Sequence, residues 1–273
     1  MNRSLLLPVA AIVTLVAAAI LWWALISPGS VEPAQGVEGD EVEALAHNCR
    51  KTTVDAIRYV VCEIDPATAD IRLFHAEAGG EDDERPWGDV EGFVAHMNAE
   101  GTPPLIAMNA GMYHSDLSPV GLLVEEGREI APVTTAGGFG NFFLKPNGIF
   151  YIDQAGQAGV METSAYLKAG VSPRIASQSG PMLVIDGELH PRFLIDGTST
   201  YTRNGIGVCA DGTVVMALSL DPVNFYGFGM AFRNAFDCPS ALFFDGSVSA
   251  LYADGTVYAE EQRPAGTVIA VME

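Results

Sequence analysis

The chain has 273 residues and a formal net charge of −20, with 34 acidic against 14 basic residues. An acidic surface of this kind disfavours nucleic acids, whose phosphate backbone it repels, and also disfavours docking on anionic lipid headgroups. Arg3 is the one charged residue among the first 26, so the remainder of the chain carries −21. That remainder is long enough to bury one sizeable hydrophobic core.

The chain opens with an uncharged apolar run, residues 5–26, which is long enough to cross a bilayer as a helix. Arg3 precedes the run, and Trp22 and Trp23 lie near its far end, a pattern typical of a span with its N-terminus in the cytoplasm. A cleaved signal usually has a shorter apolar part and a small-residue cleavage site. We therefore expect residues 1–26 to be a membrane anchor, with a cleaved signal segment as the alternative.

A linker is expected next, because residues 27–48 are rich in proline, glycine, serine and acidic residues. Residues 49–273 then form a single predicted domain. Its four cysteines are an even number, which in an exported protein suggests disulfides. Of the three possible pairings, Cys49 with Cys62 and Cys209 with Cys238 is the simplest, because each closes a short loop. Four buried free thiols are the alternative.

The first half of this domain contains patterns of both strands and helices. Residues 54–64 and 70–76 look like a strand pair, and residues 105–109 are typical of a buried central strand. Between them, apolar residues recur at spacings of three and four, which predicts a helix over residues 87–100. Glycine-containing turns between apolar runs then predict two hairpins, at residues 120–130 and 142–152.

The second half continues in the same way. A short helix is expected at residues 163–169, and Asp-Gly turns predict hairpins at residues 181–193 and 205–220. An aromatic helix over residues 224–237 and a buried strand at residues 241–245 follow. Strands outnumber helices, so the fold class we expect is α+β. It is a single domain with a largely antiparallel or mixed sheet and a few packed helices, preceded by the N-terminal hydrophobic helix.

Five segments combine glycine with polar residues at the ends of apolar runs. They read AMNAGMYHSDLSPVGL (107–122), TAGGFGNFFLKPNG (135–148), SQSGPMLVIDG (177–187), YTRNGIGVCADG (201–212) and ALFFDGSVSALY (241–252). In this order they resemble the phosphodiester glycosidase family, and its bacterial exported branch in particular. The resemblance covers nearly all of the chain from about residue 50 onwards.

The resemblance implies an enzyme that releases a sugar from a sugar phosphodiester. A phosphate monoester leaves readily without a strong general acid, so a cation that holds the phosphate matters more, and arginine suits this task. By this reasoning Arg203 is the candidate phosphate clamp and Asp245 the candidate carboxylate, acting as nucleophile, base or electrostatic stabiliser. The alternatives are an ordinary surface or salt-bridged arginine and a plain Asp-Gly turn. The family pattern has further glycines after Gly246 that this chain lacks.

Asn109 and His114 complete the predicted catalytic set. The Asn109 amide is predicted to bind the sugar or to orient a reactive water. His114 is predicted to act as an acid, a base or a sugar ligand. The alternatives are an amide that caps a tight turn for Asn109 and an ordinary loop histidine for His114. Further candidate substrate-binding residues lie in the same motifs: Gly111, Gln178, Ser179, Gly180, Asn204, Gly246 and Ser247. The aromatic residues of 225–232 are expected to pack in the core and not to stack on a sugar.

No cofactor is expected, although loops rich in aspartate leave a Ca²⁺ site open as an alternative. The expected partners are a glycan or sugar phosphodiester and, through the N-terminal helix, a membrane. The expected location is the cell envelope, with the domain anchored in the periplasm, or secreted if the N-terminal segment is cleaved. A non-catalytic glycan-binding module and a scaffold of an envelope complex are the alternatives to an enzyme.

Overall fold

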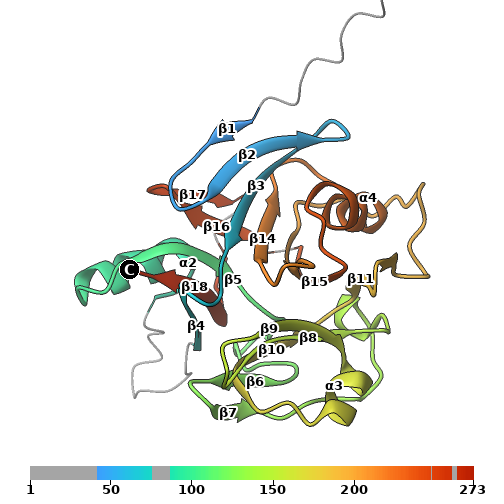
Figure 1. Ribbon diagram of the computed structural model, residues 1–273, viewed down its shortest axis with the longest axis horizontal. Coiled ribbons are helices and arrows are strands. Elements are labelled where there is room, and N and C mark those ends of the chain that lie inside the picture. Colours follow the sequence, from blue (N-terminus) through green and yellow to red (C-terminus); the bar gives the residue numbers. More distant parts are fainter. Residues whose placement is uncertain (1–41, 76–86, 247, 260–262) are drawn as a thin grey trace, which may run out of the picture. The chain divides into compact units, whose positions relative to one another are not determined.

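The computed structural model describes residues 42–75, 87–246, 248–259 and 263–273 (Figure 1). The predicted apolar anchor and most of the predicted linker lie outside these residues. Within them strand β1 (Glu43–Ala44) already belongs to a sheet, although it falls in the predicted linker. No helix in the described part of the chain has the length and apolar character needed to cross a membrane.

The largest sheet has eight strands in the order β1-β2-β3-β14-β13-β15-β11-β12. Its strands are β1 (Glu43–Ala44), β2 (Cys49–Val54), β3 (Ile57–Ile64), β11 (Met182–Ile185), β12 (Glu188–Leu189), β13 (Asn204–Val208), β14 (Val214–Ser219) and β15 (Ser240–Asp245). Its central strand β14 is buried along its whole length because both faces of the sheet are covered. This explains why its sequence, VVMALS, shows no alternation of apolar and polar residues.

Two five-stranded sheets complete the β-structure. The first, in the order β17-β16-β5-β18-β4, contains β4 (Asp70–His75), β5 (Pro104–Asn109), β16 (Ala250–Ala253), β17 (Thr256–Ala259) and β18 (Thr267–Met272). The second, in the order β7-β6-β10-β8-β9, contains β6 (Leu123–Glu125), β7 (Arg128–Ala131), β8 (Gly148–Asp153), β9 (Ala158–Glu162) and β10 (Pro173–Ser179). All the strand pairs that the structure describes in the three sheets are antiparallel.

One hydrophobic core is shared by all three sheets. Met216 and Leu242 of the large sheet, Ile106 and Ile269 of the first small sheet, and Ile175 of the second all belong to it. Alternate residues of the large sheet face the other way, because successive side chains on a strand point to opposite faces. The sheets therefore enclose a common interior and leave their outer faces for helices to cover.

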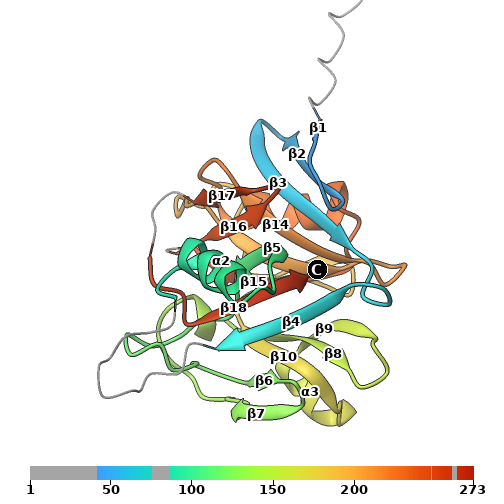
Figure 2. The same cartoon turned by 90° about the vertical axis from the view of Figure 1, so that its left-hand side faces the viewer.

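Each outer face is covered by one short helix (Figures 1 and 2). Helix α2 (Val90–Ala99) packs on the first small sheet, and α3 (Thr163–Ala169) packs on the second. Helix α4 (Phe225–Met230) covers the large sheet and continues as a π-helical segment, Ala231–Ala235. A 3₁₀ turn, Asn141–Phe143, precedes β8. The described part is thus mostly antiparallel sheet with short helices, as expected.

Most of the expected elements are confirmed. The helices at 163–169, 87–100 and 224–237 form, although the last two are shorter than predicted. The hairpins at 120–130, 181–193 and 205–220 form as β6–β7, β11–β12 and β13–β14. In the first two the turn residues adopt positive φ, as the glycine-containing turns require. Both expected central strands, β5 and β15, lie inside their sheets.

Two expected pairings are wrong. The Asn147–Gly148 pair does not form the turn of a hairpin, because Gly148 begins β8 and pairs with Glu162 of β9. The Asn147 amide instead bonds to Phe142 and Thr163, which ties the segment before β8 to the start of α3. The predicted strand pair 54–64 and 70–76 also separates, since β3 joins the large sheet and β4 pairs with the C-terminal strand β18.

The predicted cysteine pairing is confirmed. Cys49 bonds to Cys62 across β2 and β3, and Cys209 bonds to Cys238, so the described residues contain no free cysteine. The second bridge links the end of β13 to the segment after α4. It therefore fastens the helix that covers the large sheet to the strand that begins at Asn204.

Candidate active site

Three of the predicted residues meet where three strands end. Asn109 is the last residue of β5, Asn204 the first of β13 and Asp245 the last of β15. The Asn204 Nδ2 donates to Oδ1 and to the backbone oxygen of Asn109, at 2.9 and 2.7 Å. The Asn204 Oδ1 accepts from the backbone N–H of Asp245 at 3.0 Å. Asn204 thus links a small sheet to the large one and holds the turn that carries Asp245.

The Asn109 amide is completely buried, and its orientation follows from its partners. Its Oδ1 accepts a hydrogen bond from the backbone N–H of Ala250 at 2.8 Å, in addition to the one from Asn204. A backbone N–H can only donate, so this atom must be the oxygen. Within the described residues, its Nδ2 has no hydrogen-bond partner. Asn109 therefore presents a spare buried donor next to the Asp245 turn.

Asp245 is half-buried at the edge of this network. Its Oδ1 accepts from the backbone N–H of Gly246 at 2.6 Å, and its backbone oxygen accepts from the Ser249 hydroxyl at 2.8 Å. The Asp245 backbone is thereby fixed on both sides, by Asn204 and by Ser249. A carboxylate with a fixed backbone and an accessible side can act on a bound molecule in a defined direction.

Arg203 lies beside this turn and is completely buried. Its Nε donates to the backbone oxygen of Val223 at 2.8 Å, and its Nη2 donates to that of Ser199 at 2.9 Å. Its Nη1 has no partner among the described residues and lies 3.5 Å from the position that a Cβ on Gly246 would occupy. The guanidinium therefore has one unused amino group, next to the Gly246 turn.

Aromatic rings surround this guanidinium. The Arg203 Cζ lies 3.8 Å from the ring centre of Phe225, 5.3 Å from that of Phe243 and 5.6 Å from that of Tyr201. Burial lowers the pKa of Arg203 to about 10, although the electrostatic interactions with Tyr201 and Asp245 act in the opposite direction. Arg203 is thus a cation with little solvent around it, and its field acts strongly on nearby anions.

Tyr113 belongs to the same surroundings, although the sequence did not single it out. Its hydroxyl donates to the backbone oxygen of Pro264. Burial raises the pKa of Tyr113, and the negative charge of Asp245 raises it further. Tyr113 lies in the same sequence motif as Asn109. Its position in that motif is the signal by which the sequence could have identified it as a site residue.

His114 and its neighbour Asp116 occupy an exposed loop. The backbone N–H of His114 donates to the Ser118 oxygen at 2.8 Å, and Asp116 accepts from both the N–H and the hydroxyl of Ser118. The bonds from Ser118 lower the pKa of Asp116. The structure therefore places His114 on the loop that follows Asn109, with its ring open to solvent.

The predicted residues of the segment 177–180 are engaged with the protein itself. The Gln178 amide makes four hydrogen bonds, to the backbone N–H of Leu122, to both backbone groups of Thr134 and to the hydroxyl of Thr163. The Ser179 hydroxyl donates to the backbone oxygen of Phe244 at 3.1 Å. These two side chains hold β10 against the neighbouring segments.

Two of the predicted glycines are needed for close packing. A Cβ on Gly111 would lie 2.6 Å from the backbone oxygen of Gln178, and one on Gly180 would lie 2.8 Å from that of Phe142. Contacts this short force the backbone to move, so only glycine fits at either position. Ser247, the remaining predicted residue, lies outside the described residues.

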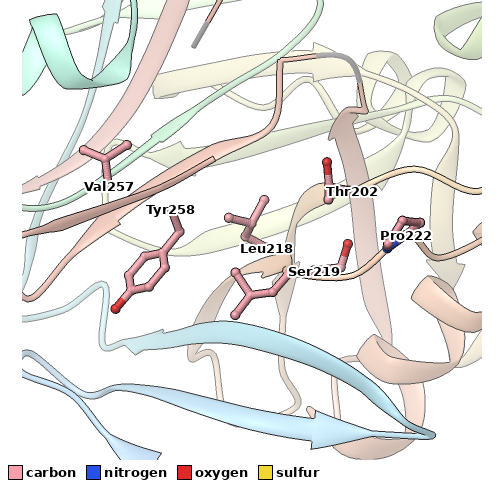
Figure 3. A pocket seen from close by; sticks show the side chains of 7 residues that line it. Thr202, Leu218, Ser219, Pro222, Val257 and Tyr258 are labelled. Carbon is pink, nitrogen blue, oxygen red and sulfur yellow. The ribbon is translucent and has the colours of Figure 1, made fainter. Parts of the chain in front are cut away.

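A pocket of about 340 Å³ lies between the large sheet and β17. In Figure 3, Val257 and Tyr258 stand across it from Leu218, Ser219 and Thr202. None of the residues predicted from the sequence lines this pocket. The part of the chain that the structure describes contains no group of three or more His, Cys, Asp or Glu side chains placed to hold a metal ion.

Comparison with known proteins places the chain in a family. The sequence profile of the phosphodiester glycosidases matches residues 103–272. The uncharacterized protein YigE of Escherichia coli K12 is 32% identical over 208 residues, which cover 76% of this chain and 79% of that protein. The chain belongs to the phosphodiester glycosidase family.

Solved structures share the fold. The zebrafish N-acetylglucosamine-1-phosphodiester α-N-acetylglucosaminidase catalytic domain, auto-inhibited by its pro-peptide, superimposes with a TM-score of 0.59 and 15% identity, covering 85% of this chain and 88% of that one. A hypothetical protein from Synechocystis gives a TM-score of 0.50 with 12% identity, covering 85% of this chain and 61% of that one. The chain therefore shares its fold with the zebrafish catalytic domain.

Proposed function

We propose that this chain is a hydrolase that cleaves the bond between a sugar and a phosphate in a glycosyl phosphodiester. Family membership supports a glycosidase-type function. In the proposed reaction the bond between the anomeric carbon and the bridging oxygen breaks, and water supplies the new hydroxyl group. The products are a free sugar and a phosphate monoester, and the proton released by water goes to the monoester or to solvent.

Asp245 is the proposed catalytic carboxylate, and its placement is the observation that carries the proposal. It is half-buried, it ends a buried strand, and its backbone is fixed by Asn204 and Ser249. The buried positive charge of Arg203 interacts electrostatically with the Asp245 carboxylate. An ionised carboxylate serves as nucleophile or base and stabilises the positive charge that develops on the sugar ring.

Arg203 is the proposed cation for the phosphate. A phosphodiester bound beside Asp245 would place two negative charges close together, and Arg203 offsets their repulsion. Its unused Nη1 lies towards the Gly246 turn and is the donor left for a phosphate oxygen. The absence of bulk water around this guanidinium strengthens its effect compared with that of a surface arginine.

Asn109 and Asn204 have different proposed roles. The Asn204 amide forms hydrogen bonds with Asn109 and with the backbone of Asp245, so we assign Asn204 as a positioning residue. Asn109 keeps its Nδ2 for a substrate oxygen or a reactive water. Gln178, whose amide is fully engaged, positions the loop around Thr134.

We also propose that the protein works in the cell envelope. The two disulfides support this location, because disulfides persist in oxidising compartments and are rare in the cytosol. The uncharged apolar run at residues 5–26 supports membrane anchoring or export. Protease accessibility of the folded part in intact spheroplasts tests the proposal, and full protection would contradict it.

A turnover assay tests the activity. Its substrates are a panel of sugar 1-phosphates, including those of hexosamines, in which the phosphate also carries a p-nitrophenyl ester. The purified full chain is compared with Asp245→Asn and with Asp211→Asn as a matched control. Asp211 also precedes a glycine, but its carboxylate accepts from the backbone of Thr213 in the β13–β14 turn. Free sugar released by the wild type and by Asp211→Asn, but not by Asp245→Asn, is the expected result. Equal turnover by all three proteins would contradict the assignment.

A further inference from the structure

Arg203 lies at the end of a column of three stacked rings, which are those of Phe225, Phe193 and His190. Its guanidinium lies over the ring of Phe225, with Cζ 3.8 Å from the ring centre. Phe225 also stacks on Phe193, with ring centres 5.1 Å apart and 12° between planes. Phe193 in turn stacks on His190 at 4.7 Å and 22°. Phe225 therefore packs against both Arg203 and Phe193, which agrees with the expectation that the aromatic residues of 225–232 pack and do not stack on a sugar.

The column is fastened at both ends. Phe225 also meets the ring of Phe243 edge-on, with centres 4.9 Å apart. At the far end His190 is buried, and its Nδ1 accepts from the backbone N–H of Arg192. The rings consequently form a fixed surface against which one face of the guanidinium rests.

Hydrogen bonds alone do not fix the Nη1 amino group of Arg203. Nε and Nη2 are bonded to backbone oxygens of Val223 and Ser199, which belong to connecting segments and not to strands. A planar guanidinium bound at one edge can still tilt about that edge. Contact with the flat face of Phe225 removes this freedom and directs Nη1 towards the Gly246 turn.

We propose that Phe225 is a positioning residue that holds the Arg203 guanidinium flat, with its unused Nη1 directed at the Asp245–Gly246 turn. The link to catalysis rests on the proposed function, since the position of Arg203 matters for turnover only if Arg203 acts on the substrate. The immobilisation itself does not depend on any activity, so the two can be tested separately.

The first experiment follows hydrogen exchange at the Arg203 Nε–H by NMR in the full chain. This proton is buried and bonded to Val223 and should exchange slowly in the wild type. Phe225→Leu, which removes the flat face but keeps an apolar side chain, should speed exchange by about tenfold or more as the guanidinium becomes mobile. Phe225→Tyr keeps the ring and should exchange as the wild type does.

Phe232→Leu is the matched control. Phe232 is fully buried in the π-helical segment that follows α4, where it packs edge-on with Phe228 and Phe236. Its truncation should lower overall stability, as that of Phe225 does, yet leave Nε–H exchange at Arg203 unchanged under native conditions. If Phe225→Leu exchanges at the wild-type rate, or no faster than Phe232→Leu, the positioning role is wrong.

The second experiment measures turnover of the sugar phosphodiester by the same variants. Phe225→Leu should lower kcat by about tenfold to a hundredfold, because a misplaced charge loses most of its effect in the transition state, with a smaller rise in KM because Arg203 also contacts the bound phosphate. Phe225→Tyr should restore kcat, and Phe232→Leu should retain it. A wild type with no turnover would contradict the proposed function but leave the exchange experiment decisive. Normal kcat with rapid Nε–H exchange would overturn the link between Phe225 and catalysis.

Discussion

The Asn204 amide nitrogen donates to two oxygens of Asn109 at once, at 2.9 and 2.7 Å, although the two residues belong to different sheets. The same Asn204 side chain accepts from the Asp245 backbone. Asn204 and Asp245 are Cα partners in the β13–β15 register, so the contact is built into the large sheet. The candidate site is thus located at the junction between two sheets, and its geometry depends on their relative position.

Asn204→Ala should weaken both the fold and the site. The change leaves the Asn109 oxygens and the Asp245 N–H with fewer partners in a buried place, which should lower the free energy of unfolding by about 2–3 kcal/mol. Chemical denaturation measures this loss. Asn147→Ala is the control, because Asn147 is also buried and bonded to Phe142 and Thr163. Only Asn204→Ala should lose turnover per folded molecule; retained turnover would contradict a positioning role.

Two glycine substitutions should behave in opposite ways. A Cβ on Gly246 would contact the Phe243 ring at 3.4 Å and Nη1 of Arg203 at 3.5 Å, which is ordinary packing distance. Gly246→Ala should therefore fold normally but place a methyl group against Nη1 and reduce turnover. Gly111→Ala would place its Cβ 2.6 Å from a backbone oxygen and should lower the free energy of unfolding by about 1–3 kcal/mol. Thermal melts and turnover assays separate the two effects; full activity of Gly246→Ala would contradict the proposed role of Nη1.

The acid stability of the fold should depend in part on His190. Burial lowers the pKa of His190 below its ordinary value. The unfolded chain therefore binds this proton at a higher pH than the folded one, so the contribution of His190 to stability is complete above about pH 6.5 and is lost as the pH falls below it. His190→Gln should reduce the drop in Tm between pH 7 and pH 5. An equal drop in both proteins would show that His190 titrates normally.

Arg203→Met should separate activity from stability. Burial of the charge is unfavourable, as its pKa of about 10 indicates, whereas its bonds to Val223 and Ser199 are favourable. These effects oppose each other, so we expect the free energy of unfolding to change by less than about 2 kcal/mol. Turnover should fall by about a hundredfold or more because the site loses its positive charge. A large loss of stability with normal specific activity would assign Arg203 to the structure alone.

The sequence was informative about local structure and about the residues of the site. Turn signals predicted the hairpins at Glu126–Gly127 and Asp186–Gly187 because positive φ is a local property. The five motifs, which place polar residues at the ends of apolar runs, predicted that Asn109, Asn204 and Asp245 are site residues. The structure brings these three residues together. Whether these residues act on a substrate remains a prediction.

What the sequence did not predict depends on contacts between distant segments. β4 and β18 are separated by most of the chain, and neither carries a pattern that identifies its partner. The Asn147–Gly148 pair resembles a turn, but its role is set by the buried bond to Thr163. The complete burial of Arg203 was also unexpected, because it results from Phe225 and Phe243, which lie in other segments.

Identifying which bond breaks is the most direct test of the proposed reaction. We would run the hydrolysis of a sugar phosphodiester by the full chain in water enriched in ¹⁸O and analyse the phosphate monoester by mass spectrometry. A glycosidase breaks the bond on the sugar side, so the monoester should carry no label. A labelled monoester would mean that water attacks phosphorus, and it would contradict the assignment of Asp245 and Arg203 to chemistry at the anomeric carbon.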